Sequence, residues 1–287
     1  MKKRFYIGLL LALGILGLLS GCGRYSSDQT EINGRSEEEL KSRTAEETTM
    51  EEENGKESRD KNAVRVTPTS EITELETGLS MVRYEGEYGF DTFSEQGGAA
   101  SDADVAAYIT SLLAQEIQME GAPFGCSTLS VENQDGGYLF GRNFDWNACN
   151  GLIVSARPEK GCFSVSTVNM DFIRAGGLDI SQLPDSMQAF VSLYAPLDGM
   201  NEKGLAVSVN MIQDSVSINQ DTAKPDLTTT TAVRLLLDKA ADVEEALELL
   251  QQYDFHSSMG MMVHLVLADA DGRSVAVEYV DNEMIVT

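Results

Sequence analysis

Histidine is scarce in this chain, and cysteine is scattered. Only two histidines, His256 and His264, occur among the 287 residues. The cysteines are Cys22, Cys126, Cys149 and Cys162. Zinc sites draw on histidine and cysteine ligands at short, regular spacings, which these positions do not offer. We therefore expect a protein that works without a metal or another cofactor.

Positive charge is also in short supply. Lysine and arginine total 21 against 46 aspartates and glutamates, which gives a formal net charge of -25. A protein that binds nucleic acid needs lysine and arginine to displace the counterions of the polyanion. The composition therefore argues against a nucleic-acid partner.

Large apolar residues are sparse between Ser26 and Thr69. Two runs in this stretch, Glu37 to Glu39 and Glu51 to Glu53, also repel themselves. Such a segment cannot bury enough apolar surface to offset the entropy lost on ordering. We predict a disordered acidic tether over residues 22–75. A binding segment for a basic partner is the alternative.

One long apolar run is present, from Phe5 to Leu19, directly after the basic residues Lys2 to Arg4. It is short for a membrane span, which needs about 20 residues. The sequence Leu19-Ser20-Gly21-Cys22 resembles a bacterial lipobox. Residues 1–21 are therefore predicted to be a lipoprotein signal peptide, with Cys22 as the site of lipid attachment. This places the protein on the extracytoplasmic face of the bacterial cell membrane, held there by its lipid; an uncleaved signal anchor leaves it on the same side.

An odd number of cysteines remains if Cys22 carries lipid. Outside the cell, three cysteines leave at least one free thiol. Cys149 and Cys162 flank an expected hairpin over residues 151–170 and could form a disulfide, which the sequence leaves open.

Residues 76–125 read as a helical pro-segment that packs on the domain that follows. Ser101 and Asp104 form a capping-box pattern at the start of a helix. The apolar residues after them recur at helical spacing, at Val105, Tyr108, Ile109, Leu112, Leu113 and Ile117. Glycine and proline in the loop over residues 120–125 indicate an irregular, accessible backbone, where the chain could be cut.

Downstream of Cys126, hairpins alternate with helices. Asp135-Gly136 is the preferred pair for a two-residue turn, which would place Cys126 directly across from Asp145. Further strands are expected at Leu152 to Ala156, Cys162 to Val168, Gly204 to Met211, Met262 to Ala268 and Ser274 to Val280, and helices at Ala232 to Ala241 and Asp242 to Leu250. This pattern is typical of a layered α+β domain. Because the last residues, Met284 to Thr287, look like another strand, we expect the given sequence to be a fragment.

Three short motifs carry a family resemblance. They are Gly125-Cys126-Ser127-Thr128, Gly141-Arg142-Asn143-Phe144-Asp145-Trp146 and Asp198-Gly199-Met200-Asn201-Glu202-Lys203-Gly204-Leu205. In this order they resemble the choloylglycine hydrolases, or linear amide C-N hydrolases, which are N-terminal nucleophile hydrolases. The resemblance covers residues 126–287. It implies a four-layer αββα sandwich, incomplete at its C-terminus, because the family's second oxyanion asparagine and a further arginine would fall beyond Thr287.

The resemblance also implies roles for individual residues. Cys126 would be the nucleophile, freed as a new N-terminus by a cut after Gly125, with its own α-amino group, of pKa about 8, as the base. Arg142 would favour the thiolate, and Asp145 would accept a hydrogen bond from the α-amino group. Strand alternation sends these two side chains to opposite faces, so a bulge or bend would be needed to aim both at Cys126.

Acyl transfer from an amide also needs a hydrogen-bond donor for the oxyanion that forms during the reaction. Asn210 is the candidate donor, since a well-placed donor is worth roughly 3 kcal/mol. Asn201 is expected to be a turn residue.

We therefore expect an enzyme that hydrolyses a small non-peptide amide through a thioester. Conjugated bile salts, N-acyl lipids, acyl-homoserine lactones and penicillin V are candidate substrates, and a homo-oligomer is left open. One alternative is a catalytically inactive, lipid-anchored binding protein that keeps the fold. Another is a cysteine endopeptidase, although neither His256 nor His264 lies in a papain-like context.

Overall fold

The computed structural model describes residues 70–113, 125–145, 149–175, 180–212 and 216–287. The predicted signal peptide, the lipid site Cys22 and nearly all of the predicted tether lie outside these ranges, as do residues 114–124 ahead of Cys126. Within the described ranges, no helix is both long and apolar enough to cross a membrane.

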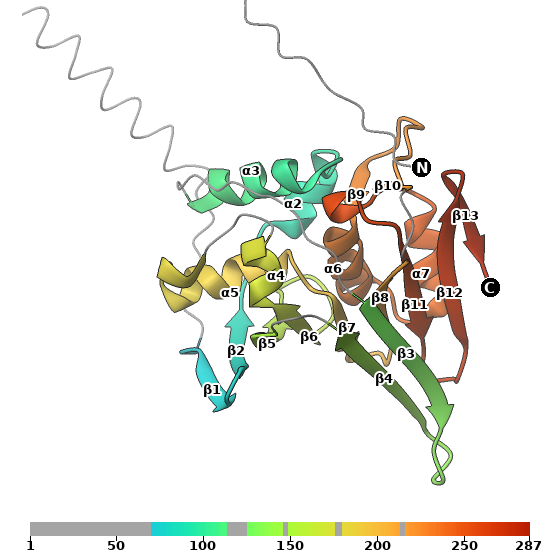
Figure 1. The fold of residues 1–287 in the computed structure, drawn as a ribbon, viewed down its shortest axis with the longest axis horizontal. Coiled ribbons are helices and arrows are strands. Elements are labelled where there is room, and N and C mark those ends of the chain that lie inside the picture. Colours follow the sequence, from blue (N-terminus) through green and yellow to red (C-terminus); the bar gives the residue numbers. More distant parts are fainter. Residues whose placement is uncertain (1–69, 114–124, 146–148, 176–179, 213–215) are drawn as a thin grey trace, which may run out of the picture. The chain divides into compact units, whose positions relative to one another are not determined.

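A nine-stranded sheet forms the centre of the described residues (Figure 1). Its strands, in spatial order, are β1 (Thr73–Glu76), β2 (Leu79–Glu85), β5 (Gly151–Arg157), β6 (Ser164–Asn169), β7 (Asp198–Asn201), β8 (Ala206–Met211), β11 (Val263–Ala268), β12 (Ser274–Val280) and β13 (Glu283–Val286). Neighbouring strands are antiparallel, except that β2 runs parallel to β5. The hairpins expected downstream of Cys126 are confirmed, and the final strand-like run forms β13.

Helices cover one face of this sheet. They are α2 (Phe90–Glu95), α3 (Asp102–Leu113), α4 (Met170–Ala175), α5 (Asp185–Leu193), α6 (Thr229–Lys239) and α7 (Val243–Leu250), with short 3-10 turns at Ile180–Gln182 and Ser258–Gly260. Helix α5 contacts β2 and β5, and α6 contacts β7 and β8. The two helices predicted between residues 232 and 250 are confirmed as α6 and α7. The mixture of sheet and helices confirms the α+β class.

Helix α7 begins with an N-terminal cap at Asp242. The Asp242 side chain accepts a hydrogen bond from the Glu245 backbone N–H at 3.0 Å, and the Glu245 carboxylate accepts one from the Ala241 N–H at 2.8 Å. These two bonds satisfy N–H groups that have no partner within the helix.

Asp242→Ala is expected to lower the free energy of unfolding by about 1 kcal/mol, because the cap is lost. Asp242→Asn keeps an acceptor at the same place and is expected to have a much smaller effect. Urea denaturation of both variants measures the difference, and equal losses would contradict the capping role.

Hairpin β3 (Gly125–Glu132) and β4 (Tyr138–Asp145) forms a separate two-stranded sheet. It packs on the face of β8 opposite to α6, so that helix, sheet and hairpin follow one another as layers at β8. A second small pair, β9 (Asp226–Thr228) and β10 (Asp254–His256), is parallel.

The prediction of a two-residue turn in this hairpin is wrong, and the pairing of its strands differs from the predicted register by one residue. Cys126 pairs with Phe144, and Asp145 pairs with Gly125. The reason lies in Asn133, whose side-chain oxygen accepts the backbone N–H groups of Asp135 and Gly137 at 2.9 and 3.0 Å. This asparagine turn closes a longer loop and shifts every pair by one residue.

The segment before Cys126 is more than a helix. The predicted helix is confirmed as α3, and the Ser101 hydroxyl accepts the Asp104 backbone N–H at 3.2 Å. However, β1 and β2 precede it, so the description of residues 76–125 as helical is incomplete, and the predicted tether ends before Thr73. In β2, Val82 and Tyr84 alternate with exposed residues and are fully buried, which is the burial pattern of a strand.

Candidate active site

Cys126 lies near the start of β3 and faces the nine-stranded sheet. Cross-strand partners share one face of a hairpin, and Cys126 pairs with Phe144 while Thr128 pairs with Arg142. Arg142 is therefore a diagonal neighbour of Cys126 on the same face. Its Nη2 donates to the Cys126 Sγ at 3.0 Å. The predicted association of Arg142 with the thiol is thus present, and a regular ladder is enough to produce it.

Arg142 is fixed by three further contacts. Its Nη1 lies 3.2 Å from the Asp198 carboxylate, its Nη2 donates to the Val209 carbonyl at 3.1 Å, and its guanidinium lies 4.3 Å from the ring centroid of Phe144. The Arg142 side chain is only 8% exposed. A guanidinium held in this way is pre-organised beside the sulfur.

Sequence analysis assigned no role to Asp198, the carboxylate partner of Arg142, or to Thr167, which binds Asp198. Thr167 donates its hydroxyl to the Asp198 carboxylate, and Asp198 pairs with Arg142. Burial raises the pKa of Asp198, while Thr167 and Arg142 work against that rise. Asp198 opens the third motif, but an aspartate before glycine looks like a turn residue. Its pairing with Arg142 follows only from the placement of β7 beneath β4.

The surroundings of Cys126 disfavour the thiolate in the uncut chain. Burial raises its pKa, and this outweighs the lowering by the Arg142 cation and by a hydrogen bond from the Met211 backbone N–H. Arg142 lowers the pKa of the thiol, as predicted, but the increase in pKa caused by burial is larger in the uncut chain.

Asp145 points away from the thiol. It lies on the opposite face of β4, is exposed, and accepts a hydrogen bond from Asn143 Nδ2 at 2.6 Å. The ladder from Gly125 to Glu132 has no shift in register, so the bulge that could have aimed both Arg142 and Asp145 at Cys126 is not there. Asp145 instead lies across from Gly125, at the end of β3 that precedes the thiol.

Asn210 lies on β8 beneath the hairpin and is 6% exposed. Its Oδ1 accepts the Thr128 hydroxyl at 2.8 Å, and Thr128 also lies 2.9 Å from the Ser208 hydroxyl. The next residue along β8, Met211, is the one whose N–H reaches the Cys126 sulfur. The structure therefore brings Asn210 into the neighbourhood of Cys126. It also adds Thr128 and Ser208 to the candidate site, and the alternation of side chains along β3 and β8 could have indicated both residues.

Asn201 behaves as the predicted turn residue. Its Oδ1 accepts the backbone N–H groups of Lys203 and Leu205, and its Nδ2 donates to carbonyls of Leu237 and Ala240. All of its polar capacity is used to join the β7–β8 turn to the end of α6.

A cavity of about 440 Å³ opens beside Arg142 and Asp198. Its walls are mostly apolar and come from β2, β4, β5, β6 and β7, with Leu79, Phe140, Phe144, Val168, Leu197 and Met200 among them. This volume is in the range of small-molecule sites. Cys149 also lines it, and Cys126, Cys149 and Cys162 are all free thiols, so the disulfide left open by the sequence is not formed.

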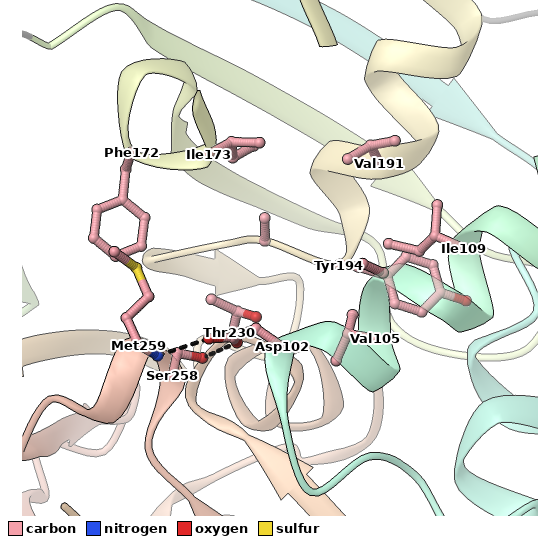
Figure 2. A pocket seen from close by; sticks show the side chains of 12 residues that line it. Asp102, Val105, Ile109, Phe172, Ile173, Val191, Tyr194, Thr230, Ser258 and Met259 are labelled. Carbon is pink, nitrogen blue, oxygen red and sulfur yellow. Dashed lines mark hydrogen bonds between the residues drawn. The ribbon is translucent and has the colours of Figure 1, made fainter. Parts of the chain in front are cut away.

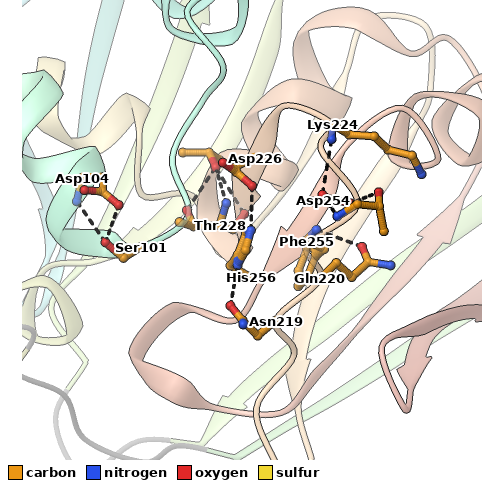
Figure 3. A network of polar contacts seen from close by, with 12 residues as sticks. Ser101, Asp104, Asn219, Gln220, Lys224, Asp226, Thr228, Asp254, Phe255 and His256 are labelled. Carbon is orange, nitrogen blue, oxygen red and sulfur yellow. Dashed lines mark hydrogen bonds and ion pairs between the residues drawn. The ribbon is translucent and has the colours of Figure 1, made fainter.

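In the described residues, neither histidine forms a hydrogen bond with Cys126. Figure 3 shows His256 between Asn219 and Asp226, each 2.8 Å from one ring nitrogen, so both nitrogens are occupied. The Nδ1 of His264 lies 3.5 Å from the Glu278 carboxylate. This arrangement argues against the cysteine endopeptidase alternative.

A thiol beside a buried guanidinium that itself lines an apolar cavity is suited to acyl transfer from an amide. The sequence profile described as linear amide C-N hydrolases, choloylglycine hydrolase family, matches residues 126–287, which is more than half of the chain. The chain belongs to this family of hydrolases. The resemblance drawn from the three motifs is confirmed.

Individual relatives match parts of the chain. The chain is 32% identical over 157 residues to penicillin V acylase of Pectobacterium atrosepticum, which is 50% of this chain and 41% of that relative. The chain thus spans less than half the length of that relative.

Solved structures match at lower identity. Penicillin V acylase from Agrobacterium tumefaciens is 22% identical, with 60% of this chain and 44% of that chain covered and a TM-score of 0.32. A mutant of conjugated bile acid hydrolase from Clostridium perfringens is 20% identical, with 56% and 50% covered and a TM-score of 0.39.

Proposed function

We propose that this protein hydrolyses the carbon–nitrogen bond of a small, linear, non-peptide amide, with Cys126 as the nucleophile. The observation that carries the proposal is the 3.0 Å contact between Arg142 Nη2 and the Cys126 sulfur in a chain of this family. The sulfur attacks the amide carbonyl carbon, and the amine leaves with a proton. Water then hydrolyses the thioester and regenerates the thiol.

Hydrolysis of the bond between Gly125 and Cys126, which the chain carries out on itself with Cys126 as the nucleophile, creates the active form. The cut turns the nitrogen of Cys126 into an α-amino group, whose pKa of about 8 suits it to take the thiol proton. Asp145 lies across from Gly125, at the end of β3 where this amino group forms, and is assigned to orient it. The new cation close to the sulfur also lowers the pKa of the thiol, which burial raises in the uncut chain.

Asn210 is assigned to stabilise the oxyanion of the tetrahedral intermediate. The hydroxyl of Thr128 holds its Oδ1. The orientation of the carboxamide is thereby fixed, and Nδ2 is assigned to donate to the substrate oxygen.

Asn210→Leu is expected to lower kcat by about 100-fold with little change in KM, because the donor acts on the oxyanion rather than on the ground state. Thr128→Val keeps the carboxamide but loses the bond that positions it, and a smaller loss of kcat is expected. Steady-state kinetics of both variants measure the difference. An unchanged kcat in Asn210→Leu would remove this residue from the mechanism.

The cavity beside Arg142 is assigned to the acyl part of the substrate, because its walls are mostly apolar. Conjugated bile salts, N-acyl lipids, acyl-homoserine lactones and penicillin V all join an apolar acyl group to an amine. The relative named penicillin V acylase makes penicillin V the first substrate to test.

Hairpin β3–β4 belongs to the second sheet of a four-layer αββα sandwich. The protein is anchored through lipid on Cys22 at the extracytoplasmic face of a bacterial membrane, after removal of residues 1–21, and residues 22–72 form the tether.

Release of primary amine from the four substrate classes tests the activity. The purified full-length protein is expected to release amine from at least one class. Saturable binding without any release of amine would contradict hydrolysis and would identify the inactive binding lipoprotein instead.

A further inference from the structure

Strand β2 precedes Cys126 in sequence, yet it is an internal strand of the nine-stranded sheet (Figure 1). It pairs with β5 over seven successive positions, from Leu79 with Gly151 to Glu85 with Arg157, and with β1 on its other side. A strand with a partner on each side is held by two ladders of backbone hydrogen bonds. Its removal would expose the edge of β5.

The same segment buries a cluster of aromatic side chains in the core. Tyr84, Tyr88, Phe90 and Phe93 are each at most 3% exposed. The last three surround the ring of Tyr194, with centroid distances of 6.3, 5.7 and 5.9 Å. At roughly 150–250 Å² each, four buried aromatic side chains amount to several hundred Å². This approaches the 800 Å² or so that each partner buries in a stable interface, before the β2 ladder is counted.

Polar contacts fix the segment in one position. Tyr88 donates its hydroxyl to Asp238, which also pairs with the fully buried Arg234 at 2.6 Å. Figure 2 shows Asp102 at the start of α3, where it accepts from the Ser258 hydroxyl at 2.6 Å and from the Met259 backbone N–H at 2.7 Å. A carboxylate with two donors from another element specifies how α3 docks.

Backbone contacts add a third attachment, beside β9. The carbonyl of Gly97 accepts the Asp226 N–H at 2.7 Å, and the Ala99 N–H donates to the Asp226 carbonyl at 3.1 Å. Between them, Gly98 has φ of 71°, and a Cβ there would lie 1.8 Å from the Asp226 oxygen. The chain therefore approaches β9 as closely as a glycine allows.

The segment also forms part of the candidate substrate cavity. Leu79, the first residue of β2, lines the cavity together with Arg142 and Asp198. Loss of β2 would remove Leu79 from the lining. The segment therefore contributes to the site as well as to the sheet.

We infer that residues 70–113 stay bound after the cut before Cys126, as a non-covalent subunit of the active enzyme that contributes Leu79 to its substrate cavity. The inference rests on the proposed function, because it concerns the product of that cut. In the cut, water adds its hydroxyl to the Gly125 carbonyl and a hydrogen to the Cys126 nitrogen, so only one peptide bond is lost. The strand pairing, aromatic packing and hydrogen bonds that hold residues 70–113 do not involve that peptide bond.

The test separates binding of the segment from self-cleavage. The full-length chain carries Cys126→Ala, which blocks the proposed self-cleavage, and a recognition sequence for a sequence-specific protease between Leu113 and Gly125. After digestion, both fragments are expected to elute together in size-exclusion chromatography and to give one complex in native mass spectrometry. Separation without denaturant would overturn the inference, whether or not the wild-type protein cuts itself.

A matched pair of variants locates the contact. Tyr88→Phe loses the bond to Asp238 across the interface and is expected to raise the dissociation constant of the cut complex about tenfold. Tyr84→Phe loses only a 2.8 Å bond to the Glu87 carbonyl within the segment, and little change is expected. Equal weakening by the two variants would overturn the assignment of Tyr88 to the interface.

Discussion

Cys126→Ala is expected to lower amide hydrolysis by about 10⁴-fold or more, because loss of the nucleophile removes the covalent pathway altogether. The sulfur is the atom that Arg142 and the Met211 backbone N–H approach, and no other thiol in the described residues has this pair of donors. Steady-state release of amine from the best substrate measures the loss, and circular dichroism checks that the variant folds.

Cys162→Ala is the matched control for that variant. Cys162 is also a free thiol, but in the described residues it lacks the contacts with Arg142 and with the Met211 backbone N–H that Cys126 has. Its replacement is expected to change the rate by less than a few fold. Activity that survives Cys126→Ala and disappears with Cys162→Ala would contradict the assignment of the nucleophile.

Arg142→Met is expected to raise the pKa of the Cys126 thiol further. Removal of a nearby cation disfavours the thiolate, so the pKa moves upward, by about 1–3 units for a contact this close. At any pH below that pKa, less thiolate is present. The rate of alkylation of the Cys126 peptide, followed against pH by mass spectrometry, should rise at higher pH than in the wild-type protein. A profile that stays in place or moves to lower pH would contradict this role.

The same variant is expected to destabilise the fold by about 3 kcal/mol, because it leaves the carboxylate of Asp198 buried without its cation. Arg174→Met is the control, since Arg174 pairs with Asp171 at 3.3 Å but has a side chain 40% exposed. An exposed pair of this kind contributes less than about 1 kcal/mol. Urea denaturation compares the two variants.

The fold was predictable where a local pattern decides the structure. Alternation in β5, β6, β8, β11 and β12 and the Asp242 cap of α7 are properties of short stretches of chain. The register of hairpin β3–β4 was missed by one residue because the Asn133 side chain outcompeted the two-residue turn suggested by Asp135-Gly136. The place of β2 was missed because pairing with β5 joins segments some 70 residues apart, and no local pattern records such a pairing.

The candidate site was predictable only where its residues lie close together in the sequence. Cys126 and Arg142 belong to one hairpin, so their contact follows from strand parity. Asp198, from β7, reaches Arg142 only when the hairpin is laid on the sheet, and Thr167, from β6, binds Asp198. Asp145 was expected to act on an α-amino group that the uncut chain does not have, and the geometry places it at the end of β3 where that group would form.

Intact mass and N-terminal sequencing of the purified full-length protein, beside Cys126→Ala, test the central claim most directly. The wild-type protein should contain a fragment that begins at Cys126, and the variant should remain uncut at this bond. A wild-type chain that stays intact before Cys126, in a preparation that binds amides without hydrolysing them, would contradict the account.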